Sequence, residues 1–172
     1  MLSKAKPNGL ISSKKNYPEK NSGQIKLNQK ISGEKNLAKL IESMTPQLLN
    51  NEYIFGTLEF GTLKHIDYQQ LSVLEPIGTF QEKEGLTVIL TKEKANQHNV
   101  SYQGVFKCIT LNVHSSLDAV GLTAAVASAL AQENISTNVV AAYFHDHIFI
   151  ASKDADNALK ALHLLSKKGL NY

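Results

Sequence analysis

The ordered part of the chain opens with a segment whose apolar residues have helical spacing. In "SGEKNLAKLIESMTP" four apolar residues recur at i, i+3, i+4 and i+7: Leu37, Leu40, Ile41 and Met44. This spacing lines one face of a helix. Ser32 is the expected N-cap and Pro46 the expected stop signal. The pattern therefore predicts a short amphipathic helix ahead of the first strand.

The rest of the chain alternates between strand-like and helix-like patterns. Strand-forming residues occupy 53–60, and a polar connector follows at roughly 61–72. Residues 74–97 predict a strand, a turn at Gly85, a second strand and a short helix. The expected elements of the second half are a strand at 105–113, a helix at 119–134, strands at 135–144 and 147–151, and an amphipathic helix at 154–170 that ends near Gly169.

The second half therefore has the order β–α–β–β–α, which is the ferredoxin-like arrangement. The first half repeats parts of it: "GTLEFGTL" (56–63) is similar to "ITLNVHSSL" (109–117), and "ILTKEKA" (89–95) to "FIASKDA" (149–155). We expect an α+β protein of two ferredoxin-like modules in tandem, with antiparallel sheets and helices packed on one face. The expected boundaries are 32–102 and 103–172.

Charge separates the N-terminal segment from the rest. Residues 1–30 hold seven Lys and one Glu, whereas residues 31–172 hold eleven Lys and fourteen acidic residues. The basic segment is rich in Asn, Ser and Gly and has no apolar period, so residues 1–31 are expected to be a disordered Lys-rich tail. The chain contains no arginine, the usual residue for bidentate contacts with phosphate and guanine. A mildly acidic folded part without arginine argues against nucleic-acid binding.

Three further features limit the class of protein. The single cysteine, Cys108, excludes an intrachain disulfide and a cysteine-based zinc site. No apolar run approaches the roughly 20 residues that span a bilayer. The N-terminus has lysines but no apolar core of a secretory signal. We therefore expect a cytoplasmic protein without a membrane partner.

The topology brings two polar segments to one end of the second module. The loop "HSSLDAVG" (114–121) and the hairpin at "HDH" (145–147) must both lie there, because the third strand returns beside the first. A helix N-terminus attracts a carboxylate, and Asp146 could hold an ammonium group. Asp118 or Ser116 could cap the helix. Together these groups suit an α-amino acid or a similar zwitterion.

Two other chemistries remain open for these residues. His145 and His147, with His114 nearby, could hold a metal, although zinc sites normally show three or four converging ligands. Ser115 or Ser116 could form a triad with Asp146 and a histidine, but no G-x-S-x-G elbow is present. A third alternative is a capped helix start without any ligand. The apolar helix at 119–134 is expected to pack on the sheet and also on the partner module or a second subunit.

The same residues resemble a family. "VHSSLDAVGLTAAVASALAQENISTNVVAAYFHDHIFIA" resembles the second module of small bacterial tandem-ACT-domain proteins. "SGEKNLAKLIESMTPQL", "YIFGT" and "FQEKEGLTVIL" resemble their first module, so the resemblance covers about 32–168. The chain is also similar to the ACT modules of eukaryotic cytosolic arginine sensors. One departure is that a full ACT module ends in a fourth strand, whereas this chain ends just after its last helix; the modules could share strands.

The resemblance implies a non-enzymatic regulatory protein that senses a small amino acid at a module interface, without a cofactor and as a homodimer. The implied ligand-binding residues lie in the loop and the hairpin: Ser115, Ser116, Leu117, Asp118, Val120, Gly121, Phe144, His145, Asp146 and His147. The alternatives are a protein-interaction or assembly module without a small ligand, and a metal-dependent enzyme that uses the His-Asp-His hairpin.

Overall fold

The structure, a computed structural model, describes residues 33–58, 68–116 and 118–169. The predicted tail at 1–31 and the candidate residue Leu117 lie outside this part of the chain. The helices and strands are α1 (Leu37–Ser43), β1 (Pro46–Leu58), α2 (Tyr68–Leu74), β2 (Gly78–Gln81), β3 (Leu86–Thr91), α3 (Lys92–Gln97), β4 (Phe106–Leu111), α4 (Leu122–Gln132), β5 (Asn138–Ala141), β6 (Asp146–Ala151), η1 (Ser152–Asp154) and α5 (Ala155–Lys168).

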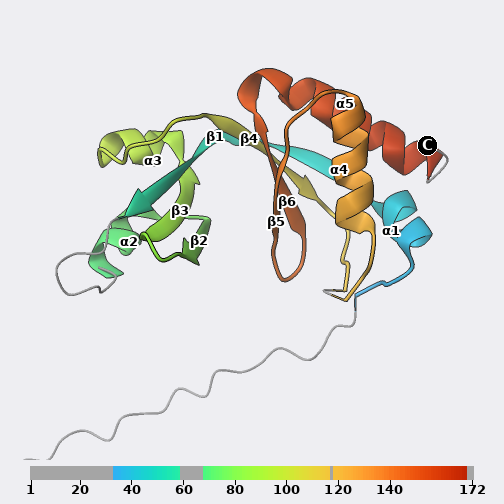
Figure 1. Cartoon of the computed structure of the whole chain (residues 1–172), viewed down its shortest axis with the longest axis horizontal. Helices are drawn as coiled ribbons and strands as arrows, with labels where there is room; N and C mark the ends of the chain where they lie inside the picture. The colour runs from blue at the N-terminus through green and yellow to red at the C-terminus, as the bar shows by residue number, and fades with distance from the viewer. Residues whose placement is uncertain (1–32, 59–67, 117, 170–172) are drawn as a thin grey trace, which may run out of the picture. The chain divides into compact units, whose positions relative to one another are not determined.

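The strands form one six-stranded sheet in the order β2-β3-β1-β4-β6-β5. Every neighbouring pair is antiparallel. Figure 1 shows α2 and α3 with β1 to β3, and α1, α4 and α5 with β4 to β6. The predicted α+β class with an antiparallel sheet is therefore confirmed, and the two modules share a single continuous sheet.

The internal repeat predicted from short sequence matches is present in the strand register. Tyr53–Leu58 pairs with Leu86–Thr91 in the same alignment in which Phe106–Leu111 pairs with Asp146–Ala151. The outer pairs, β2 with β3 and β5 with β6, also agree with each other. Each residue of β2, β3 and the second part of β1 thus has a defined counterpart in the second module.

The central strands are shared between the two modules. The first part of β1 pairs with the end of β4, from Pro46 opposite Leu111 to Leu48 opposite Ile109. This part of β1 is the fourth strand of the second module. The start of β4 lies beside the first module's own strand, with Phe106 opposite Tyr53. The two modules therefore share strands, as the sequence analysis considered.

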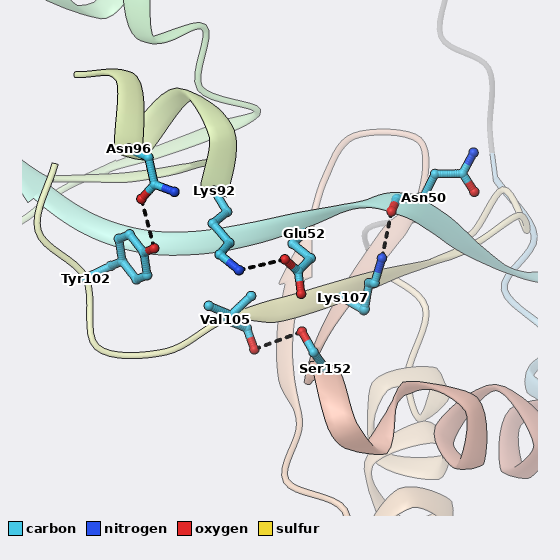
Figure 2. A network of polar contacts seen from close by, with 8 residues as sticks. All are labelled: Asn50, Glu52, Lys92, Asn96, Tyr102, Val105, Lys107 and Ser152. Atoms are coloured by element: carbon cyan, nitrogen blue, oxygen red, sulfur yellow. Dashed lines mark hydrogen bonds and ion pairs between the residues drawn. The ribbon is translucent and has the colours of Figure 1, made fainter. Parts of the chain in front are cut away.

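A local interruption of the β1–β4 ladder marks the junction of the two modules. The register shifts between Leu48 and Glu52. One side chain bridges the two strands here (Figure 2): Lys107 Nζ of β4 donates to the Asn50 carbonyl of β1 at 2.6 Å. On the other side of β1, Lys92 Nζ at the start of α3 lies 2.9 Å from Glu52 Oε2. The hydrogen bond from Lys92 lowers the pKa of Glu52. Polar contacts thus replace ladder bonds where the strand bulges.

The helices pack on one face of the sheet, as predicted. Strand residues alternate between faces, and those facing the helices form two apolar clusters. The cluster under α1, α4 and α5 contains the strand residues Ile109, Leu111, Ile148 and Ile150. The cluster under α2 and α3 contains the strand residues Ile54, Leu86, Val88 and Leu90.

The opposite face carries a smaller aromatic cluster that spans both modules. The ring of Phe55 makes edge contacts with Phe106 and Phe149, with centroids 5.4 and 5.1 Å apart. Tyr53 makes a similar contact with Phe149 at 5.9 Å. Cys108 is fully buried in this cluster, and burial raises its pKa to about 11. A thiol in this state is poorly nucleophilic, which fits its expected role as a small buried apolar residue.

Three local predictions in the first module were wrong. Asn36, not Ser32, caps α1: its side-chain oxygen accepts from the Lys39 N–H at 3.1 Å. The first strand begins at Pro46 rather than at 53, since proline is tolerated as the first residue of a strand. The expected polar connector contains the helix α2 at Tyr68–Leu74. None of the helices that the structure describes is both long and apolar enough to cross a membrane.

Candidate functional site

The His-Asp-His triplet is divided between a turn and a strand. The turn between β5 and β6 is closed by the Ala142 N–H, which donates to the His145 carbonyl at 3.1 Å. Asp146 and His147 are then the first two residues of β6. Because successive strand residues point to opposite faces, Asp146 and His147 lie on different sides of the sheet.

The hairpin meets the chain that leaves β4, as the topology argument predicted. His145 Nδ1 lies 3.3 Å from the carbonyl oxygen of Val113. The ring of Phe144 lies 5.8 Å from the ring of His114. Figure 1 shows the tip of this hairpin and the start of α4 at the same end of the second module. The loop and the hairpin therefore meet at this end of the second module. We call the polar and aromatic surface that they form, residues 113–116, 118–121 and 142–147, the mouth.

Asp146 is the unusual residue of this mouth. Its side chain is only 8% exposed, and it lies opposite Leu111 on the helix-covered face. Burial raises the pKa of its carboxyl group, while His147 and His145 act in the opposite direction. Among the described residues, its carboxylate makes no hydrogen bond and no ion pair, and its oxygens are not completely enclosed. A buried carboxylate without a cation is costly unless a ligand or a proton compensates it.

His147 belongs to the other face of the sheet. Its Nδ1 shares a hydrogen bond with the Thr110 hydroxyl, 3.0 Å away, and the two residues are cross-strand partners. Burial lowers the pKa of His147. The sequence analysis did not include Thr110, although the strand register pairs it with His147 once β4 and β6 are placed side by side.

The start of α4 differs from the prediction. Neither Asp118 nor Ser116 caps the helix; its N-cap is Gly121, with φ 104°. The left-handed conformation favours glycine, and a Cβ there would lie 2.7 Å from the Leu37 side chain. The Ser116 hydroxyl instead accepts from the Asp118 N–H at 3.3 Å. Val120, immediately before the helix, is 84% exposed.

The segment just before α1 lies against the candidate loop, which no local sequence signal indicated. The Glu34 N–H donates to His114 O at 3.1 Å, and the Ser116 N–H donates to Glu34 O at 3.0 Å. Ser115 forms an isolated parallel bridge with Glu34. A Cβ on Gly33 would lie 2.3 Å from the backbone of Ser116, so only glycine allows this approach. We call residues 33–36 the strap.

The strap also contributes one charge contact to the loop. Lys35 Nζ lies 3.6 Å from Asp118 Oδ2, and both side chains are largely exposed. Asp118 is therefore paired within the chain at the surface, whereas Asp146 is buried. The two carboxylates predicted for the site have different roles in the structure.

The helix α4 has its helix contacts within the described chain. It packs against α5 and against α1, which lies within the predicted bounds of the first module. Its buried residues Leu122, Val126 and Leu130 join the cluster over β4 and β6. Small residues on its other faces allow these close helix contacts, which is why the sequence pattern appeared apolar all round.

The alternative chemistries can be compared with the geometry of the described residues. Within them, no group of three or more His, Cys, Asp or Glu side chains is placed to hold a metal ion. Asp146 and His147 face opposite sides of the sheet, and His147 is bonded to Thr110. Asp146 therefore cannot orient His147 as a triad requires.

The fold defines the class: two ferredoxin-like modules in tandem that share one antiparallel sheet. The chain belongs to the ACT domain family, as a tandem ACT domain protein. One family match covers residues 32–107 and a second covers 105–164. The two matches overlap at 105–107, where β4 begins and contributes to both modules.

Solved structures show the same fold. A Vibrio cholerae protein of unknown function, described as a possible transport protein, is 45% identical with a TM-score of 0.66, and the match covers 76% of this chain and 95% of that one. An Agobacterium tumefaciens protein is 19% identical, with a TM-score of 0.57 and coverages of 72% and 89%. The regulatory subunit of aspartate kinase from Thermus thermophilus is 11% identical, with a TM-score of 0.55 and coverages of 72% and 97%. Among curated proteins, none is significantly similar in sequence.

Proposed function

We propose that this protein is a non-enzymatic regulator that binds one small amino acid, or a similar zwitterion, at the mouth of its second module. The observation that carries the proposal is the Asp146 carboxyl group, which is only 8% exposed and makes no hydrogen bond or ion pair with the described residues; His147 and His145 act on it only through their charge. A ligand ammonium group would supply a direct cationic partner. It would also favour the ionised form, so binding would counteract the burial that raises the pKa of Asp146.

The opposite end of the ligand would face the start of α4. A helix N-terminus presents unpaired backbone N–H groups and a positive partial charge. The α4 helix has no side-chain cap at Gly121, so no side chain of its N-cap competes for these groups. The rings of Phe144 and His114 would form the wall between the two charged ends.

The affinity requires more than these two ends. Micromolar binding needs about −8 kcal/mol, whereas a helix terminus supplies about 0.3–2 kcal/mol and a charged hydrogen bond about 1.5–3 kcal/mol. A second surface must therefore close the mouth. Exposed apolar side chains at its edge, including Val120 and Tyr143, suit a second copy of the chain, so the proposal includes a homodimer.

Two features support the regulatory class over an enzyme. The chain has the fold of the regulatory subunit of aspartate kinase, a protein that its description assigns to regulation. Asp146 and His147, two of the residues considered for a triad, lie on opposite faces of the sheet. Regulation of a partner by an amino-acid-dependent contact is therefore the proposed activity, and the protein would act in the cytoplasm.

Isothermal titration of the purified chain with each of the twenty amino acids tests the proposal. We expect one of them to bind more tightly than about 1 mM, which corresponds to −4.1 kcal/mol. Asp146→Ala should weaken that binding at least about tenfold, or 1.4 kcal/mol. Asp156→Asn, on the exposed surface of α5, is the matched control and should leave binding unchanged. If none of the twenty binds below millimolar concentration, the amino-acid proposal fails.

A further inference from the structure

A groove in the first module lies where the second module has a strand. It has a volume of about 710 Å³ and runs from the β2–β3 turn across β3 and β1 to the segment between α3 and β4. Phe55 and Phe106 form its apolar wall, and Thr57 and Thr87 contribute hydroxyl groups. Among its described lining residues, the one charged side chain is Glu82. Its carboxylate accepts a hydrogen bond from the Thr87 hydroxyl.

The backbone edge of β1 is open along this groove. Within the described residues, β1 pairs with β4 only as far as Tyr53 opposite Phe106. Residues 54–58 continue to pair with β3 on their other side. Five residues of β1, about 17 Å of strand, therefore present one unpaired edge. An open edge of this kind accepts an added strand.

The second module shows what occupies the corresponding edge. The strand register makes Gly56–Leu58 the counterpart of Ile109–Leu111. The edge of Ile109–Leu111 is covered by Pro46–Leu48, the first part of β1. In the first module no strand of the described chain takes this place, and the groove occupies it instead.

The segment between α3 and β4 lies against β1 without pairing with it: residues 101–104 line the groove, and the Ser101 carbonyl oxygen would lie 3.3 Å from a Cβ on Gly56. Hydrogen bonds fix this segment at both ends (Figure 2). The Tyr102 hydroxyl donates to Asn96 Oδ1 of α3 at 3.0 Å. The Val105 carbonyl accepts from both the backbone N–H and the hydroxyl of Ser152, each at 3.2 Å. Residues 103–104 between these anchors line the far side of the groove. The opening is therefore a consequence of local bonding.

We propose that the open edge of β1 is a docking site for an extended peptide segment of a partner protein, which adds a strand beside residues 54–58. Its apolar side chains would face the aromatic wall. The residue opposite Thr57 would be Lys or Arg, long enough to cross β1 and reach the Glu82 carboxylate on the far side. This site is separate from the amino-acid mouth of the second module.

A synthetic peptide gives the direct test. The probe has the sequence of residues 45–50 with lysine in place of Gln47, because Gln47 lies opposite Thr110, the counterpart of Thr57. Amide hydrogen exchange of the full chain is followed by NMR. At about twice its dissociation constant, the peptide should slow exchange at edge-facing amides of residues 55–58 about threefold. The absence of any slowing there at millimolar peptide would overturn the proposal.

Modified peptides separate strand pairing from adsorption to the aromatic wall. Successive N–H groups of a strand point to opposite sides. Two peptides are made, one N-methylated at the position of Leu48 and one at the position of Leu49. Only one of these two N–H groups can face β1, so one methylated peptide should lose binding and the other should bind like the parent. If both methylated peptides bind like the parent, no strand is added and the proposal is wrong.

Charge variants test the basic residue. Glu82→Gln should weaken the lysine peptide by about two- to fivefold, the range of an exposed ion pair, and should not change binding of the peptide that retains glutamine. Glu84→Gln, in the same turn but outside the groove lining, is the matched control. If Glu82→Gln changed binding of the lysine peptide and the glutamine peptide equally, the peptide would not need a basic residue opposite Thr57.

Discussion

The two modules have the same strand register but different chemistry at the same end of the sheet. In the first module the β2–β3 turn leads into Gly85, Leu86 and Thr87; in the second the β5–β6 turn leads into His145, Asp146 and His147. Leu86 completes an apolar cluster at the position where Asp146 buries a carboxylate. The apolar ladder is thus common to both modules, and under the proposed function a few residues at one strand end would determine which module can hold an amine.

The modules also differ in how their central strands are covered. The second module is completed by the first part of β1 and by the strap, which places Glu34 against the loop at Ser115. The first module leaves an edge of β1 open. A shared sheet therefore produces two unequal halves: one with a covered edge and a buried Asp146, the other with the apolar Leu86 in its place and an open edge.

The largest expected effect tests whether the two halves fold as one unit. Ile54→Ala in the first cluster and Ile109→Ala in the second each remove a fully buried side chain and should lower the free energy of unfolding by about 2–5 kcal/mol. Because β1 and β4 belong to both modules, each variant should shift one common denaturation transition.

Chemical denaturation followed by far-UV circular dichroism and by tyrosine fluorescence measures this. Leu164→Ala, at a partly exposed position of α5, is the control and should lower the free energy of unfolding less than either buried variant does. Two separate transitions, with each variant shifting only one of them, would contradict the shared sheet.

The next effect concerns the strap, which only the second module has. Gly33→Ala places a methyl group 2.3 Å from the Ser116 nitrogen and should detach the strap. Two backbone hydrogen bonds are then lost, worth about 1–3 kcal/mol in all. Exchange of the Ser116 amide should accelerate about tenfold or more. An unchanged Ser116 amide would show that the loop does not depend on the strap.

A pH-dependent effect distinguishes Asp146 from its counterpart Leu86. Burial raises the pKa of Asp146 in the folded chain above the 3.8 of an unperturbed Asp. The folded chain therefore binds a proton over a pH range in which the unfolded chain has lost it, and ionised Asp146 lowers stability above that range. Asp146→Asn should be more stable than the wild type at pH 7.

This gain should disappear as the pH falls through the folded pKa towards 3.8. Thermal denaturation across this range measures it, with Asp156→Asn as an exposed control. A variant that is less stable than the wild type at pH 7, without added ligand, would show that Asp146 already has a cationic partner.

The smallest effect is expected at the charge contact between strap and loop. Lys35 and Asp118 lie 3.6 Å apart with exposed side chains, and such pairs contribute little. Lys35→Ala should leave the melting temperature unchanged within error. A clear decrease in the melting temperature would indicate that this charge pair, rather than the backbone hydrogen bonds of Glu34, holds the strap in place.

The sequence predicted the helices and strands whose apolar spacing is regular. It did not predict elements whose presence or length depends on contacts between residues far apart in the chain. Helices α4 and α5 and the strands β3 and β6 follow from periodicity. Helix α2 was missed because Leu71 and Leu74 alone give it an apolar face between polar neighbours. The length of β1 depends on pairing with β4 some sixty positions later, which no local pattern shows.

The candidate site was predictable in its location but not in its details. Chain topology alone brought Phe144 and His145 to the loop after β4. It could not show that Gly121 replaces Asp118 as the helix cap, because that depends on the close approach of Leu37. The roles of the predicted residues as ligand contacts remain predictions.

The central claim is that the second module alone carries the amino-acid site. The most direct test is the stoichiometry from isothermal titration of the wild type, Asp146→Asn and Glu82→Gln with the amino acid that binds. The account predicts one ligand per chain, binding weakened at least about tenfold in Asp146→Asn, and unchanged binding in Glu82→Gln. Two ligands per chain, or full affinity in Asp146→Asn, would contradict it.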